Sequence, residues 1–186
     1  MTTTIPNPRI KFTYLDYVNT PEDKRYELLD GDLIMAPAPG EIHQRVSILL
    51  GWRLVQFVTE NHLGRVYVSP FDVVLSDTDV VQPDLLFVSN ERADVITPAN
   101  VQGAPDLVVE ILSPPTAERD LTFKRGLYAR HGVSEYWIVD TTARSVTVLL
   151  LRKAGFEVAG EYGAGATLTS PTLRGFALRI DDLFRE

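Results

Sequence analysis

Residues 104–114 constrain the fold of this chain more than any other stretch, because they predict a strand buried on both faces of a sheet. Prolines near both ends favour a short strand with sharp limits. Glu110 interrupts the apolar run, and a carboxylate in a core strand is costly unless it is paired, hydrogen-bonded or bound to a metal. Glu110 is therefore the first candidate for a functional side chain. The apolar residues around it are Val108, Val109, Ile111 and Leu112.

The chain has 186 residues, of which 45% are hydrophobic, and this is enough for one globular domain with a sizeable core. We expect that domain to span residues 1–186, with residues 1–11 as an N-terminal arm. No apolar run is long enough to cross a membrane, and the first residues lack the basic and apolar segments of a signal peptide. The absence of cysteine excludes disulfides and thiolate metal sites. These features predict a cytoplasmic protein without membrane contacts.

The net charge of −7, from 25 acidic and 18 basic residues, argues against broad, non-specific nucleic-acid binding. Such binding is driven by neutralisation of phosphates, which needs an excess of basic residues. The charge does not exclude a local basic groove, and it leaves room for an acidic metal site.

Two long helices and a mixed set of strands predict an α/β (α+β) fold. Apolar residues at three- and four-residue steps predict helices over 41–61 and 117–131, the second ended by Gly132. Asp30-Gly31 predicts a hairpin turn within residues 25–35. Residues 90–103 are expected to form a loop with one helical turn. Further strands are expected at 65–69, 71–75, 81–88, 135–140, 145–152, 156–162 and 176–180, with short helical segments at 13–18 and 181–184.

Asp84 and Glu110 are a candidate pair of metal ligands, because each lies in an apolar segment that predicts a strand. Carboxylates that converge from adjacent strands can hold a hard cation such as Mg²⁺. Neighbouring strands lie about 5 Å apart, whereas Asp106 lies about 13 Å along the same strand from Glu110. Asp84 is therefore the better partner for Glu110. The alternative is that both are solvated residues at strand ends.

Lys124 lies on the helix stripe expected to face the sheet, so it needs a buried partner. Glu110, on the preceding strand, is the partner we expect. The alternative is a surface pair between Asp120 and Lys124, worth only about 0.2–0.5 kcal/mol. The full stripe comprises Ala117, Leu121, Lys124, Tyr128 and His131.

Glu27 and His43 are weaker candidates. Glu27 follows Tyr26 in an apolar strand, and from spacing alone it is equally well a further metal ligand or a surface residue beside a turn. His43 opens the long helix, where a lone histidine is more often a packing or capping group than a catalyst. The three histidines show no metal-ligand spacing.

Six segments of the chain form a familiar order: Arg25-Tyr26-Glu27-Leu28-Leu29-Asp30-Gly31, the proline-rich loop before His43, Gln82-Pro83-Asp84, Pro105 to Pro114, Asp120-x-x-x-Lys124-x-x-x-Tyr128, and Gly132 to Asp140. In this order they resemble the Uma-type restriction endonuclease family of bacteria, a branch of the PD-(D/E)xK nuclease superfamily. The resemblance covers nearly the whole chain, and the block over residues 105–140 is the most specific part.

The resemblance implies a restriction-endonuclease-like fold, with a mixed central sheet flanked by helices, and a phosphodiesterase site that uses Mg²⁺ or Mn²⁺. It implies that Asp84, Glu110 and the Ile111 carbonyl hold the ion, and that Glu27 completes the acidic cluster. The superfamily pattern places a lysine where this chain has Leu112, and in this branch Lys124 on the following helix takes that role. Phosphate contacts would come from the same helix, through Arg119, Arg125 and Arg130.

Two classes of function follow from these residues. The first is a metal-dependent DNA endonuclease with an Asp84–Glu110–Lys124 site, expected to form a homodimer. The second is a catalytically degenerate nuclease fold with a binding or regulatory role, which the acidic net charge and Leu112 favour. A third reading is a purely structural dimer built from the apolar strands at 134–162. The form and sequence of the substrate stay open.

Overall fold

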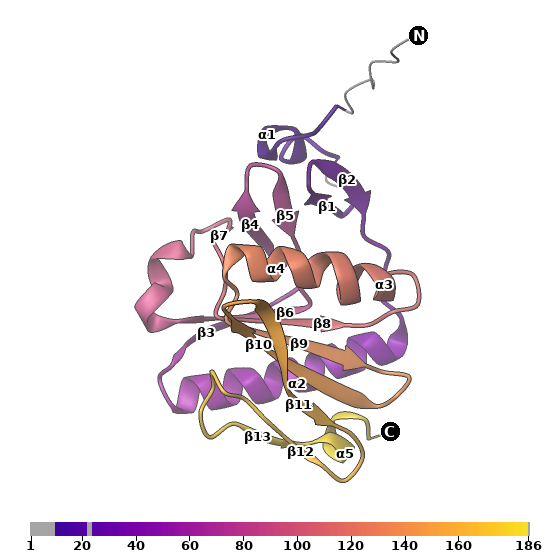
Figure 1. Cartoon of the computed structure of the whole chain (residues 1–186), viewed down its shortest axis with the longest axis vertical. Coiled ribbons are helices and arrows are strands. Elements are labelled where there is room, and N and C mark those ends of the chain that lie inside the picture. The colour runs from indigo at the N-terminus through magenta and orange to yellow at the C-terminus, as the bar shows by residue number, and fades with distance from the viewer. Residues whose placement is uncertain (1–9, 22–23, 186) are drawn as a thin grey trace.

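The computed structural model describes residues 10–21 and 24–185 and is built around a six-stranded mixed sheet (Figure 1). The strands lie in the order β11-β10-β9-β8-β6-β3. The central strands β8 (Leu107–Ile111) and β9 (Glu135–Asp140) are parallel, and the other neighbouring pairs of this sheet are antiparallel. The remaining strands are β3 (Gly64–Val68), β6 (Leu85–Ser89), β10 (Ser145–Arg152) and β11 (Gly155–Tyr162).

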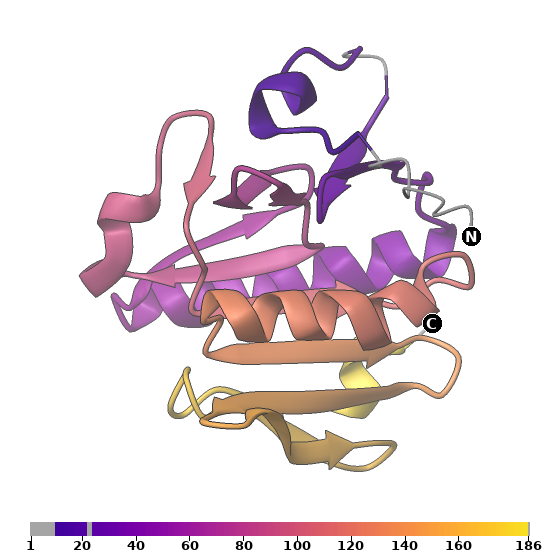
Figure 2. The same ribbon diagram turned by 45° about the horizontal axis from the view of Figure 1, so that its top comes forward.

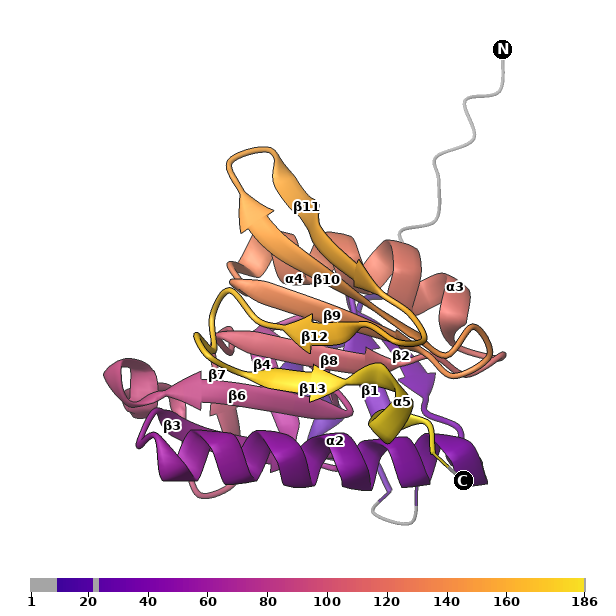
Figure 3. The same cartoon turned by 90° about the horizontal axis from the view of Figure 1, so that it is seen from below.

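Helices cover both faces of this sheet (Figure 3). On one face lies α2 (Glu41–Glu60), whose Leu50 and Leu54 belong to the same buried cluster as Val109 and Trp137 of the sheet. The C-terminal segment adds to this cluster through β12 (Thr167–Thr169), β13 (Ala177–Arg179) and α5 (Ile180–Leu183). On the other face, Val108, Leu127, Tyr128 and Tyr136 belong to a second buried cluster.

The helix on this second face follows β8 and contains a π-helical turn. It runs through α3 (Ala117–Arg119), the π turn η2 (Asp120–Lys124) and α4 (Arg125–His131), and it ends at Gly132 with a left-handed φ of 85°. A π turn carries one residue more than an α turn, so it shifts the phase of the inward-facing stripe. Leu121 is therefore 43% exposed, and its predicted place on the buried stripe is wrong.

A second sheet of five strands lies beside the first and carries the short helix α1 (Tyr14–Tyr17) (Figure 1). The predicted hairpin is present, and its turn is held by hydrogen bonds from Phe12 N to Gly31 O and from Gly31 N to Thr78 O. The strand order is β2 (Asp32–Met35), β1 (Tyr26–Leu29), β5 (Asp79–Val81), β4 (Asp72–Ser76) and β7 (Asn100–Gln102).

The strand predicted over residues 81–88 is wrong as one element, because the chain changes sheets within it. β5 ends at Val81 in the five-stranded sheet, and β6 begins at Leu85 in the six-stranded sheet. Gln82, Pro83 and Asp84 make the crossing. Asp84 is therefore not a strand residue but the residue that enters β6. Leu85 pairs with Val109, so Asp84 lies opposite Glu110 in the continued register.

Residues 90–103 contain the expected helical turn, a 3-10 helix over Asn90–Val95, and also strand β7, which was not expected. Of the predicted N-terminal arm, residues 1–9 lie outside the described residues. Lys11 contacts the turn of the hairpin, through an ion pair with Asp30 at 3.0 Å. None of the helices in the described part of the chain is both long and apolar enough to cross a membrane.

Candidate active site

Glu110 of β8 is buried on the face covered by α4, with 4% of its surface exposed. Its Oε1 accepts hydrogen bonds from Lys124 Nζ at 2.9 Å and from Tyr128 Oη at 2.6 Å. Burial raises the pKa of Glu110 well above its ordinary range, against the opposing attraction of Lys124. The carboxylate of Glu110 in this apolar strand is thus compensated by one ammonium group and one hydroxyl group, both from the following helix.

Lys124 joins three acidic side chains. Its Nζ lies 2.8 Å from Glu27 Oε1 and 2.9 Å from Glu110 Oε1, and it lies 3.5 Å from Asp120 Oδ1. Burial alone would lower the pKa of Lys124, but the three carboxylates outweigh burial and raise this pKa above its ordinary value. Burial also raises the pKa of Asp120, although the Lys124 ammonium and a hydrogen bond with Thr116 oppose this shift.

Glu27 reaches this cluster from the five-stranded sheet. It lies in β1 and is 3% exposed, and its Oε1 accepts a hydrogen bond from the backbone N–H of Gln82 at 3.1 Å. Arg119 Nη2 lies 3.7 Å from Glu27 Oε2. The cluster therefore bridges the two sheets, with Glu27 on one, Glu110 on the other and Lys124 between them.

Asp84 is fixed by two donors on one of its oxygens. Oδ2 accepts the Ile111 backbone N–H at 2.7 Å and lies 3.1 Å from His43 Nε2. Burial would lower the pKa of His43, but its hydrogen bond to Asp84 and the negative charge there raise it overall. Neither Asp84 Oδ1 nor Glu110 Oε2 accepts a hydrogen bond from the described residues, so each acid keeps one oxygen for a ligand.

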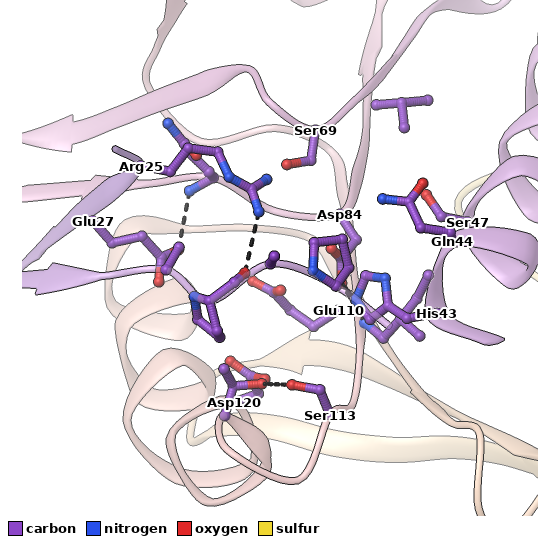
Figure 4. A pocket seen from close by; sticks show the side chains of 18 of the residues that line it. Arg25, Glu27, His43, Gln44, Ser47, Ser69, Asp84, Glu110, Ser113 and Asp120 are labelled. Carbon is purple, nitrogen blue, oxygen red and sulfur yellow. Dashed lines mark hydrogen bonds and ion pairs between the residues drawn. The ribbon is translucent and has the colours of Figure 1, made fainter. Parts of the chain in front are cut away.

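Glu27, Asp84, Glu110 and Lys124 line one pocket of about 140 Å³. Its lining comes largely from the start of α2, the β1–β2 hairpin and the start of α3, whose ribbons approach one another in Figure 2. Figure 4 shows Glu27, Asp84, Glu110 and His43 around it. Arg25 and Arg119 supply positive charge to the lining, and Arg25 Nη2 donates to Pro37 O at 3.1 Å. The pocket therefore combines recessed carboxylates with cations nearer the mouth.

The donors available for a metal ion are Asp84, Glu110 and the backbone at Ile111, all of which line the pocket. Oxygen donors of this kind suit Mg²⁺ or Mn²⁺. Within residues 10–21 and 24–185, no group of three or more His, Asp or Glu side chains is already arranged to hold a metal ion. An ion would thus need the backbone carbonyl or water in addition to the two carboxylates.

A family model described as "Uma2: Putative restriction endonuclease" matches residues 12–181. The chain belongs to this family. A crystal structure of a putative nuclease belonging to DUF820 from Anabaena variabilis ATCC 29413 has the same fold, with a TM-score of 0.79 and 21% sequence identity. The match covers 93% of this chain and 97% of that one. No protein with a curated description matches the chain.

The Uma2 match confirms the predicted family, and the structural match confirms the predicted restriction-endonuclease-like fold. The pocket brings together every acid named from the sequence for this site, together with Lys124, Ile111 and Arg119. Arg125 instead donates to Phe156 O at 2.9 Å, and Arg130 is exposed; neither lines the pocket. Their contacts with phosphates stay a prediction.

The packing of two other acids, Asp106 and Asp120, decides the alternatives considered for them. Asp106 lies apart from the pocket, where it accepts the Ser89 N–H at 2.8 Å and pairs with Arg92 at 3.3 Å. The Asp120–Lys124 pair exists, but it is buried in the cluster and is not a surface pair.

In this Uma2 chain, three contributors had no predicted role in the site: the Tyr128 hydroxyl, the Asp120 carboxylate and Arg25. Tyr128 stands four residues after Lys124, and this spacing on one helix face was the available signal. Asp120 stands four residues before Lys124 by the same rule. Arg25 lies two residues before Glu27, but nothing in the sequence indicates that the hairpin faces the pocket.

Proposed function

We propose that this protein is a metal-dependent endonuclease that hydrolyses phosphodiester bonds of DNA. The observation that carries the proposal is the position of Lys124 Nζ, within 2.9 Å of both Glu27 and Glu110 and in the same pocket as Asp84. A buried cation among carboxylates from separate elements is costly to build for stability alone. Membership of the Uma2 family of putative restriction endonucleases supports the nuclease reading.

The proposed ligands of Mg²⁺ or Mn²⁺ are Asp84, Glu110 and the Ile111 carbonyl. Asp84 Oδ1 and Glu110 Oε2 support this assignment, since the described residues leave both oxygens without a hydrogen bond. When bound, the ion would polarise the scissile phosphate and lower the pKa of a bound water. His43 and the Ile111 N–H hold Asp84 by its other oxygen, and Tyr128 does the same for Glu110.

The remaining residues of the proposed site act electrostatically. In the proposal, Lys124 orients the attacking water or stabilises negative charge that develops on the phosphate. Glu27 holds the Lys124 ammonium in place from the opposite side. Arg25 and Arg119 line the pocket and would contact non-bridging phosphate oxygens. Arg125 and Arg130, farther along the helix, would meet the flanking backbone of the substrate.

A second candidate function is a catalytically degenerate nuclease fold that binds or regulates without cleaving. Two observations favour it: Leu112 replaces the lysine of the superfamily pattern, and no group of three acidic or histidine side chains among the described residues is arranged for a metal. Calorimetric titration with Mn²⁺ separates the two functions. Binding that disappears in Asp84→Asn supports the nuclease, and the absence of binding in the unaltered protein supports the degenerate function.

Plasmid nicking with Mg²⁺ or Mn²⁺ tests the proposed activity directly. We expect cleavage by the unaltered protein, loss of cleavage in Glu110→Ala, and retention in the matched control Glu157→Ala, which removes an exposed glutamate from β11. Equal cleavage by the unaltered protein and Glu110→Ala would overturn the assigned site.

The proposal also includes a cytoplasmic location. It further includes a homodimer, because two-fold dimers are the commonest assembly of soluble proteins. Light scattering on the purified protein should then give about twice the chain mass of 20.8 kDa. A mass equal to one chain would remove the dimer from the proposal.

A further inference from the structure

An exposed apolar stripe runs along one side of α2. Ile48, Trp52 and Val55 follow one another at helical spacing and are 66%, 57% and 43% exposed. Val68 of β3, also 43% exposed, lies beside them against Gly51. β3 is the last strand at its edge of the six-stranded sheet. The stripe is thus formed by large apolar side chains that nothing within the described residues covers.

This stripe begins at the pocket. Ile48 and Val68 line the pocket mouth together with Ser47 and Gln44. Trp52 lies one helical turn farther along the same side of α2, about 6 Å from Ile48 along the helix axis. The indole ring therefore stands where a chain leaving the pocket along α2 would pass next.

Cations accompany the aromatic ring. The Arg53 guanidinium carbon lies 5.5 Å from the centre of the Trp52 ring, and among the described residues Arg53 forms no ion pair. Arg65 on β3 is exposed beside Val55 and is likewise without an ion pair there. Asp182, which lines the same surface hollow as Arg53, is paired with Arg185 at 3.5 Å. An aromatic face with uncompensated arginines suits a polyanion with stacking bases.

The depth of the pocket also favours a nucleic acid with bases free to stack on a side chain. Glu27, Glu110 and Lys124 are only 3–4% exposed, so a phosphate must enter the pocket to meet them. An unpaired strand can bend inward and turn its bases outward, whereas a stacked duplex holds both backbones in place. The recess and the Trp52 stripe therefore favour one occupant: a single strand.

We propose that the substrate is a single-stranded or locally unpaired nucleic acid. The part of the bound strand outside the pocket runs along α2, with one base stacked on Trp52 and a neighbouring phosphate at Arg53. This inference rests on the proposed function, because it takes the pocket as the place of cleavage. It deepens that function by naming the substrate class and the surface that receives it.

Fluorescence anisotropy with a labelled single-stranded dT oligonucleotide, in EDTA to prevent cleavage, tests the inference. We expect about tenfold weaker binding in Trp52→Ala, near-normal binding in Trp52→Phe, which keeps an aromatic face, and about tenfold weaker binding of a blunt duplex to the unaltered protein. In Arg53→Gln, affinity should fall with a shallower salt dependence. Val158→Ala is the matched control, because Val158 is 55% exposed on β11 at the opposite edge of the sheet.

Intrinsic fluorescence locates the contact, because the chain has two tryptophans and Trp137 is fully buried. The oligonucleotide should protect Trp52 from acrylamide quenching. Unchanged quenching, unchanged affinity in Trp52→Ala, or a duplex that binds as tightly as the single strand overturns the inference. Protection that depends on protein concentration without DNA also overturns it, since a second copy then covers the stripe.

The plasmid-nicking assay reports separately on the proposed function. Cleavage with no role for Trp52 rejects only the single-strand surface, whereas Trp52-dependent binding without cleavage of any nucleic acid rejects only the nuclease.

Discussion

Two buried glutamates on neighbouring parallel strands have opposite surroundings. Glu135 of β9 is fully buried on the α2 side of the sheet, and its two oxygens accept bonds from Trp137 Nε1, Ser170 Oγ and the Thr172 N–H. All of these donors are neutral. Glu110 of β8 lies on the other face, with a buried lysine on one oxygen and the other oxygen left for a ligand. Burial of a carboxylate therefore does not by itself indicate a functional site. The charged neighbour and the oxygen without a hydrogen bond are what make Glu110 the candidate.

The two glutamates also differ in what they contribute to the molecule. Glu135 ties the segment around Ser170 to the sheet, so its hydrogen bonds fasten the C-terminal strands to the core. Glu110 is surrounded by groups whose charges do not cancel, which is a poor arrangement for stability and a useful one for chemistry. Substitutions at and around the two glutamates should therefore separate loss of the proposed cleavage from loss of stability.

Glu110→Ala should lower the cleavage rate by about a thousandfold or more and the free energy of unfolding by about 1–3 kcal/mol, because it leaves the Tyr128 hydroxyl buried without an acceptor. The larger penalty of an unpaired buried lysine is avoided, because Lys124 keeps Glu27 and Asp120 as partners. Nicking rates and urea denaturation measure the two quantities. A large loss of stability with intact cleavage would reverse the roles assigned to the two glutamates.

Glu135→Ala should lower the free energy of unfolding by about 3–5 kcal/mol, because it leaves the Trp137, Ser170 and Thr172 donors buried without an acceptor. Cleavage by the fraction that stays folded should be unchanged. Urea denaturation gives the first quantity, and nicking at low temperature gives the second. Glu135→Gln keeps an acceptor and should lose less stability. A variant as stable as the unaltered protein would contradict the fastening role.

Lys124→Met should destabilise the protein by about 3 kcal/mol near neutral pH, because three carboxylates then lack their common cation. A buried carboxyl whose folded-state pKa is raised is more stable protonated, so its destabilising effect is present above the folded-state pKa and fades as pH falls towards the unfolded value near 4. Urea denaturation at pH 7.5 and at pH 5 should therefore show a smaller penalty at pH 5. An equal penalty at both values would argue against this cluster of acids.

Tyr128→Phe should have the smallest effect, about a tenfold loss in cleavage rate and about 1 kcal/mol in stability. The hydroxyl supplies one hydrogen bond to Glu110, and Lys124 holds the same oxygen after its removal. Nicking rates and urea denaturation again apply. An effect as large as that of Glu110→Ala would assign Tyr128 a direct part in the reaction.

The fold and the main acids could be predicted from sequence because they follow from local patterns. The apolar run of β8 and the three- and four-residue steps of α2 fix their elements whatever surrounds them. The pairing of Asp84 with Glu110 was inferred from strand spacing, although Asp84 turned out to enter its strand rather than lie within it.

Other features depend on contacts between distant segments and could not be read locally. The sheet change at Gln82–Asp84 lies between Val81 and the apolar stretch at 85–88, which were expected to belong to one strand. The π turn has no residue signature here, so Leu121 was placed on the wrong side of its helix. The difference between Glu110 and Glu135 was equally hidden, because both are single acids in apolar strands and only the packed neighbours separate them.

The bridge between Glu27 and Lys124 joins residues about a hundred positions apart in the chain and belonging to different layers of the molecule. Closing so long a loop is entropically costly, so this contact forms only after other interactions have brought the segments together. A refolding chain should accordingly recover its secondary structure before the pocket is assembled. The ion pair that organises the pocket therefore ties assembly of the candidate site to the prior folding of both sheets.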